Sequence, residues 1–351
     1  MPPPRTYLDH AATTPMLPRA REAWLAGAAI WANPSSPHAE GRVARAALED
    51  ARARVRAALG WEGELIFTSG ASEALAIGLG RAKAQRRLVS AVEHDAVFRA
   101  APDAEVLPVS GGELDRSALA ALLARPGKAI VAVQSINSET GTVLLPETGD
   151  PLAKQVRESG GLLLADCSQS AGKMALPNCD IAVVSAHKLG GPVGIGALLV
   201  RDFSMLEPSG GQERGYRAGT ENLPGALAFA AALEAGGLDA WLTSEDQRRD
   251  FANRLAAQGE VLAPGVQCGH ILAAASSRVS ATAMLIRMDA RGFAISAGSA
   301  CSSGTLRESR VLRGFGIDPD LARRTVRVSI GWNTTPGDLD AFIAAWAEAN
   351  A

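Results

Sequence analysis

The sequence lacks the features that mark several large classes of protein. It has only four cysteines, none paired as C-x-x-C, so we expect neither a disulfide framework nor a bound metal ion. It has no apolar run of about 18 residues and no signal peptide at its first residues, so we expect a cytoplasmic protein that does not bind a membrane. Its 35 Lys and Arg are balanced by 37 Asp and Glu, which argues against a nucleic-acid-binding surface.

The composition is typical of a globular protein with a sizeable core, because 47% of the 351 residues are hydrophobic and 21% are charged. Short apolar runs alternate with helical patterns over most of the chain. This alternation predicts an α/β fold with a mostly parallel sheet covered by helices on both faces. The predicted strands are 64–68, 87–92, 104–109, 129–134, 161–165, 181–185 and 195–200, and the predicted helices include one that follows residues 69–73 and reaches about residue 83, and one at 115–124.

The pattern changes near residue 234, where two glycines and a charged helix lead into a smaller α+β segment. We expect a large domain of residues 13–233 and a small domain of residues 234–351, with residues 1–12 packing on the small domain. The predicted elements of the small domain are helices 244–257, 280–289 and 336–348 and strands 293–296 and 325–330.

Polar residues follow the predicted strands, at the edge where ligands of parallel sheets bind. Lys188 lies between a buried strand and a glycine-rich turn, which suits a partly desolvated nucleophile; the alternative is a surface lysine. Asp166 ends another strand and can pair with a protonated pyridine nitrogen, or it can simply cap a helix. Gln169 can bond the phenolic oxygen of the same ring.

Residues 69–73 lie between a strand and a helix, where helix N-terminal amides and a hydroxyl form a phosphate cradle. Together with Lys188 and Asp166 in one sheet, this cradle predicts a site for pyridoxal phosphate (PLP). Two histidines follow strands on the same edge. His94 can stack on a flat ring or shuttle protons, and His187 can donate to a phosphate.

Cys301 lies in residues 296–304, where nearly every neighbour is small or polar. This context predicts an exposed, flexible loop, which suits a thiol that must reach a bound substrate and withdraw. Cys179 and Cys268 have no such context and are expected to be structural. Cys167 follows Asp166, so we expect it at the pocket wall without a chemical role.

Together these residues resemble the cysteine desulfurases of the NifS/IscS type, in the class V aminotransferase family of fold-type I PLP enzymes. The matching motifs span residues 7–15, 33–36, 67–73, 93–94, 165–170, 185–188, 210–220, 299–301 and 327–331. The chain departs from these relatives at Ser138, where an asparagine usually helps to hold the cofactor ring. It also departs at Trp332, where a basic residue is common, and in a shortened stretch from 234 to 278.

The resemblance implies specific roles. Lys188 carries PLP as a Schiff base, Asp166 pairs with the pyridinium, and Gln169 bonds the phenolic oxygen. His94 stacks on the ring and serves in proton transfer. The further residues that the resemblance implies are Ala71, Ser72, Ser185, His187 and, from the partner subunit, Thr220 for the phosphate, Ser138 for the ring, and Asn33 and Arg327 for the substrate carboxylate.

By the same resemblance, the reaction converts L-cysteine to L-alanine and leaves the sulfur on Cys301 as a persulfide. The expected partners are a second copy of the chain in a homodimer and a protein sulfur acceptor, as in iron–sulfur cluster biogenesis. A selenocysteine lyase and another class V transaminase or lyase remain open, although Cys301 favours sulfur transfer. A scaffold without catalysis would lack Lys188, Asp166 or Cys301, and all three are present.

Overall fold

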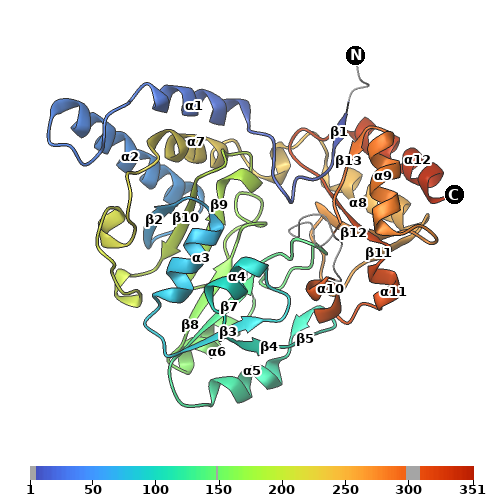
Figure 1. Cartoon of the computed structure of the whole chain (residues 1–351), viewed down its shortest axis with the longest axis horizontal. Helices are drawn as coiled ribbons and strands as arrows, with labels where there is room; N and C mark the ends of the chain where they lie inside the picture. Colours follow the sequence, from blue (N-terminus) through green and yellow to red (C-terminus); the bar gives the residue numbers. More distant parts are fainter. Residues whose placement is uncertain (1–4, 148, 298–308) are drawn as a thin grey trace.

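The computed structural model describes residues 5–147, 149–297 and 309–351. Its centre is a seven-stranded sheet (Figure 1). In spatial order its strands are β2 (Glu64–Thr68), β10 (Gly196–Val200), β9 (Ile181–Ser185), β8 (Leu162–Asp166), β7 (Ala129–Gln134), β3 (Arg86–Ser90) and β4 (Glu105–Leu107). β10 runs antiparallel to both of its neighbours and the other strands pair in parallel, which confirms the predicted mostly parallel sheet.

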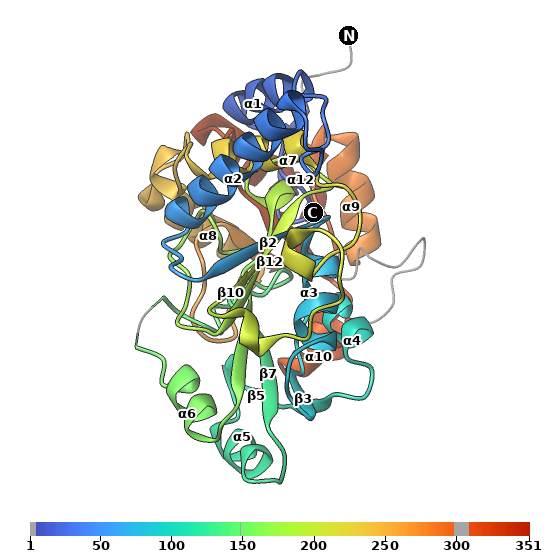
Figure 2. The ribbon, with the colours of Figure 1, turned by 90° about the vertical axis from the view of Figure 1, so that its left-hand side faces the viewer.

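Helices cover both faces of this sheet, because its strands carry apolar side chains on both sides. The helices are α1 (Pro18–Ala28), α2 (Ala39–Ala58), α3 (Ala71–Gly80), α4 (Asp95–Ala100), α5 (Arg116–Leu123), α6 (Leu152–Glu158) and α7 (Leu223–Leu233). Successive side chains of β2 point to opposite faces. Leu65 and Phe67 belong to the apolar core that includes residues of α2 and α7, whereas Ile66 belongs to the core that includes residues of α3 and α4. Figure 2 shows these helices around β2.

A second, three-stranded antiparallel sheet lies in the C-terminal part, in the order β11 (Glu260–Leu262), β12 (Ile271–Ala275) and β14 (Thr325–Ser329). The helices of this part are α8 (Glu245–Ala256), α9 (Ala281–Ala290), α10 (Arg310–Gly314), α11 (Pro319–Ala322) and α12 (Pro336–Asn350). β1 (Thr6–Tyr7) pairs in parallel with β13 (Phe293–Ala294), so the N-terminal segment lies on this part (Figure 1). The division into domains at residue 233 stays a prediction.

Several predicted elements are shorter in the structure, and two of them show why. The strand predicted at 104–109 ends as β4 at Leu107, because Pro108 has no N–H to donate; the chain then forms β5 (Val109–Ser110), which pairs with β6 (Glu113–Leu114). The helix predicted to reach residue 83 ends at Gly80, and Ala82 bridges to Leu206 instead. Within the described residues, no helix has the length and apolar character needed to cross a membrane.

Candidate active site

A cavity of about 670 Å³ lies at the carboxyl ends of β2, β3, β7, β8 and β9. The sequence-predicted residues that line it are Ala71, Ser72, His94, Ser138, Asp166, Gln169, Ser185, His187, Lys188 and Arg327. Arg327 comes from β14 of the second sheet, so the cavity lies between the two sheets. The parallel strands bring their polar ends to one edge, as the sequence predicts.

Asp166 is the last residue of β8, and its side chain is buried in the cavity wall. Its Oδ1 accepts hydrogen bonds from the backbone N–H of Ser168 (2.9 Å) and from the Ser168 hydroxyl (2.5 Å), which fix the carboxylate in a turn. A buried carboxylate is stable when a cationic group meets it. Asp166 is therefore suited to hold a protonated ring nitrogen.

Cys167 does not line this cavity, contrary to the expectation from sequence. Successive residues at the end of β8 point to opposite sides, so Cys167 enters the apolar core when Asp166 faces the cavity. Cys179 belongs to the same core, and burial raises the pKa of its thiol to about 12. Cys268 is also buried, in a separate apolar cluster. A structural role suits all three thiols.

Lys188 ends a short 3₁₀ turn, Ala186–Lys188, that follows β9. The N-terminal segment holds the backbone of this turn, because Thr14 donates from its N–H to the His187 carbonyl (2.7 Å) and from its hydroxyl to the Lys188 carbonyl (3.3 Å). The side chain of Lys188 is half-buried at the cavity. Burial and the charge of Lys188 lower the pKa of His187 to about 4.

His94 is the N-cap of α4, and its Nδ1 accepts a hydrogen bond from the Ala96 N–H (3.1 Å). Burial lowers the pKa of His94, and the charge of Lys188 lowers it further. The ring is therefore neutral near pH 7. Because Nδ1 is an acceptor, the single ring proton is on Nε2.

The N-terminus of α3 supplies the predicted phosphate cradle. Gly70 precedes the helix with φ of 150°, a conformation that glycine adopts without strain, so the first-turn amides of Ala71 and Ser72 face the cavity edge. The carboxylate of Glu73 also lines the cavity, but it accepts hydrogen bonds from the Ser69 N–H (2.5 Å) and the Arg217 guanidinium (3.0 Å). These two donors offset a charge that would otherwise repel a phosphate.

The cavity residues fit PLP. The volume of the cavity suits a small cofactor with a substrate. Asp166, Lys188 and the α3 cradle offer partners for the ring nitrogen, the aldehyde carbon and the phosphate of PLP, respectively. The amide nitrogen of Gln169 donates one N–H to the Ala11 carbonyl (2.9 Å), which leaves a second N–H for the phenolic oxygen.

Arg327 is nearly enclosed, with 7% of its side chain exposed. Its Nη2 forms an ion pair with Asp9 Oδ1 (2.8 Å), and its Nη1 donates to the backbone carbonyl of Ser138 (2.9 Å). The sequence did not predict Asp9 as the partner of Arg327, since nothing in its local pattern indicates a partner 318 residues away. Ser138 contacts this arginine through its backbone, which any residue at that position provides.

Two predicted binding residues do not reach the cavity of their own chain. Asn33 is exposed in the loop between α1 and α2, and its Oδ1 instead accepts a hydrogen bond from the Ser35 N–H (2.8 Å). Within its own chain the side chain of Asn33 is used in this local turn, and its predicted contact with the substrate carboxylate stays a prediction. Thr220 is also exposed and away from the cavity. Its predicted contribution to the partner subunit stays a prediction.

Cys301 lies outside the described residues. The described chain on either side of it meets the cavity wall. Ser296 exchanges backbone hydrogen bonds with Arg327, and the Ser309 hydroxyl donates to Glu139 Oε2 (2.6 Å). Glu139 lines the cavity, and burial raises its pKa.

The model of the class-V aminotransferase family matches residues 6–342. The chain belongs to this family. A cysteine desulfurase of Frankia sp. (strain EuIK1) is 38% identical to it, over 95% of this chain and 88% of that protein. An IscS-like cysteine desulfurase of Mycobacterium tuberculosis is 34% identical, over 96% of this chain and 94% of that protein. Members of the class-V family are in general PLP-dependent enzymes.

Solved structures agree with this assignment. A NifS-like protein from Rickettsia africae superposes with a TM-score of 0.86 at 25% identity, covering 98% of this chain and 99% of that one. SspA in complex with cysteine superposes with a TM-score of 0.78 at 27% identity, covering 94% of this chain and 100% of that one. The predicted family and the predicted fold type I are confirmed.

Proposed function

We propose that this protein is a PLP-dependent cysteine desulfurase, which converts L-cysteine to L-alanine and transfers the sulfur to Cys301. The observation that carries the proposal is a single cavity that collects Lys188, Asp166, His94 and Arg327 from four separate elements. The relatives named cysteine desulfurase, which align over nearly the whole chain, support the same reaction.

PLP, when bound, supplies an electron sink for the pair of electrons left at the substrate Cα. The protein's part is to hold and move protons. The carboxylate of Asp166 would keep the ring nitrogen protonated, and the amine of Lys188 would take the proton from Cα. A half-buried lysine suits this role because partial desolvation favours the neutral amine.

His94 holds its proton at Nε2, since Nδ1 is occupied by the Ala96 N–H. We propose that this ring lies against the face of the cofactor and supplies or accepts protons near the substrate sulfur. The Cys301 thiolate attacks that sulfur, so an S–S bond forms as the C–S bond breaks. The substrate Cβ gains a proton to become the methyl group of alanine, and Cα regains the proton held by Lys188, which balances the reaction.

The carboxylate of the substrate is assigned to Arg327, whose guanidinium fork matches a carboxylate. Asp9 holds one end of this fork in place before substrate arrives. Because Asp9 is partly exposed, with 20% of its side chain accessible, its own charge can be hydrated while the arginine meets a second carboxylate.

The proposal extends to the partners. A homodimer would supply Thr220, and the loop that carries Asn33, from a second chain, since both residues are exposed away from the cavity of their own chain. We also propose a protein sulfur acceptor, as in iron–sulfur cluster biogenesis, and a cytoplasmic location.

The test is the stoichiometry of alanine and sulfide formed from cysteine by protein purified with added PLP, with and without candidate acceptor proteins. A visible absorbance band that borohydride abolishes is expected, and its absence would refute the cofactor assignment. Parallel kinetics with selenocysteine decide between a desulfurase and a selenocysteine lyase.

Cys301→Ser should keep the visible band but form neither alanine nor sulfide from cysteine, because the hydroxyl cannot accept the sulfur. Ser303→Ala, a change of similar size in the same stretch of sequence, serves as the matched control and should keep its activity. Full desulfurase activity in Cys301→Ser would refute the acceptor role of this thiol.

A further inference from the structure

Residues 91–94 connect β3 to α4, end at His94 and belong to neither a helix nor a strand. Side chains from other elements hold the carbonyls of this turn instead. The Val92 carbonyl accepts from the amide nitrogens of Asn137 (3.2 Å) and Gln134. The placement of His94 therefore depends on donors that come from distant parts of the chain.

Arg310 supplies the other donors. Its Nη1 donates to the Ala91 carbonyl (2.6 Å), and its Nη2 donates to the Glu93 carbonyl and to Asp95 Oδ1 (3.2 Å). Its guanidinium carbon lies 3.9 Å from the centroid of the Phe98 ring on α4. One planar group thus contacts the turn before His94, the residue after it and the helix that His94 caps.

The element that carries Arg310 is itself fixed to the cavity wall. Arg310 is the first residue of α10, and Ser309 caps this helix by accepting from the Leu312 N–H (3.1 Å) while it donates to Glu139. Arg310 also lines the cavity, and about a third of its side chain is exposed. The side chain of Arg310 is therefore fixed at its backbone end by α10 and at its guanidinium end by the turn.

We propose that Arg310 is a positioning residue that holds the ring of His94 at the face of the cofactor. This inference rests on the proposed function, because the role of His94 belongs to it. A guanidinium suits the task better than an ammonium, since its planar fork reaches two carbonyls and a carboxylate at once and still stacks on an aromatic ring. Nothing in the local sequence around Arg310 indicates this role.

Arg310 also changes the charge around His94. The charged groups that act on the His94 ring are Lys188 and Arg99, which lower its pKa, and Asp166 and Asp95, which raise it. Arg310 pairs with Asp95 and offsets its charge. Removal of this guanidinium leaves Asp95 unpaired next to the ring, so the pKa of His94 should rise.

The test compares Arg310→Gln and Arg310→Lys with Arg313→Gln, a matched control at an exposed position of the same helix. The first readout is nitrogen NMR of labelled histidines in the cofactor-free protein, with the His94 signal assigned from His94→Asn. It reports the tautomer and the pKa of the ring. The second readout is kcat and KM for alanine formation from cysteine, with visible circular dichroism of the PLP-loaded protein.

We expect the wild type and Arg313→Gln to share one His94 spectrum, with the proton on Nε2. In Arg310→Gln the pKa of His94 should rise, its two tautomers should mix, and the visible dichroism should change. The value of kcat should fall by about 10- to 100-fold while KM stays within about threefold, as misplacement of a catalytic group predicts. Arg310→Lys should lie between the two.

A wild-type His94 spectrum in Arg310→Gln would overturn the proposal, whether or not kcat falls. If Arg310→Gln does not fold, Arg310→Lys decides in the same way, because an ammonium cannot reach all three acceptors. A wild type that forms no alanine from cysteine would refute the proposed function instead, and the cofactor-free spectra would still report whether Arg310 places the His94 ring.

Discussion

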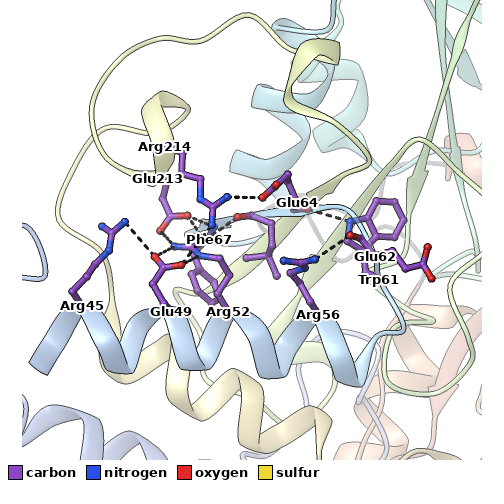
Figure 3. A network of polar contacts seen from close by, with 11 residues as sticks. Arg45, Glu49, Arg52, Arg56, Trp61, Glu62, Glu64, Phe67, Glu213 and Arg214 are labelled. Atoms are coloured by element: carbon purple, nitrogen blue, oxygen red, sulfur yellow. Dashed lines mark hydrogen bonds and ion pairs between the residues drawn. The ribbon is translucent and has the colours of Figure 1, made fainter. Parts of the chain in front are cut away.

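Replacement of Glu213 by alanine should cost more stability than any change of a surface charge in this protein. Glu213 and Arg52 form a bidentate ion pair, with N–O distances of 2.7 and 3.0 Å and with 1% and 4% of their side chains exposed (Figure 3). Glu213 also accepts from the Phe67 N–H (2.8 Å), and Arg52 donates to the Leu65 carbonyl (2.8 Å). The pair therefore covers the outer edge of β2, which is an edge strand of the sheet.

The magnitude follows from what the substitution leaves behind. In Glu213→Ala the guanidinium of Arg52 stays buried without its main counter-charge, which costs about 3–5 kcal/mol. The free energy of unfolding of a domain is about 5–15 kcal/mol, so the loss is large. Backbone strain does not enter, because alanine and glutamate meet the same cost at the positive φ of 46°. The half-exposed pair of Arg214 and Glu64 should contribute only about 0–1 kcal/mol.

The assay is equilibrium urea unfolding of the cofactor-free protein, followed by circular dichroism. Glu213→Ala, Arg52→Met and the double variant form a thermodynamic cycle, with Arg214→Gln as the surface control. The double variant buries no unpaired charge, so it should cost at least about 2 kcal/mol less than the sum of the single changes. Additive losses, or a loss in Glu213→Ala no larger than that in Arg214→Gln, would refute this reasoning.

Two further predictions concern the pH dependence of stability, measured as urea unfolding at several pH values. Burial raises the pKa of the Glu93 carboxyl from 4.5 to about 8, so between these pH values the folded chain holds a proton that the unfolded chain lacks. As the pH rises through this range, the free energy of unfolding should fall by up to about 5 kcal/mol, and Glu93→Gln should lack this fall. Burial lowers the pKa of Lys173 to about 8. Above pH 8 only the unfolded chain keeps the proton of this lysine, so the free energy of unfolding should rise as the pH approaches 10.5. The rise should be at most about 3 kcal/mol, because the side chain is only half-buried, and Lys173→Met should not show it. A variant with the wild-type pH dependence would contradict the prediction made for its residue.

Local sequence patterns were sufficient for the central sheet. The strands predicted at 64–68, 129–134 and 181–185 have the same bounds in the structure, because each is a continuous apolar run bounded by polar residues. Such patterns do not predict that β10 runs antiparallel to its neighbours. An antiparallel strand with both faces buried has the same apolar run as a parallel one, so only its neighbours in the sheet fix its direction.

The sequence by itself predicted the polar residues that line the cavity, since Lys188, Asp166, His94 and the α3 cradle each occupy a short motif at the end of a strand. Only the tertiary structure decided what orients them. Arg310 contacts the turn before His94 from more than 200 residues away in the chain, and Asp9 meets Arg327 across 318 residues. Such contacts leave no periodic signal in either segment, because each partner is an ordinary charged residue until the fold brings the two together.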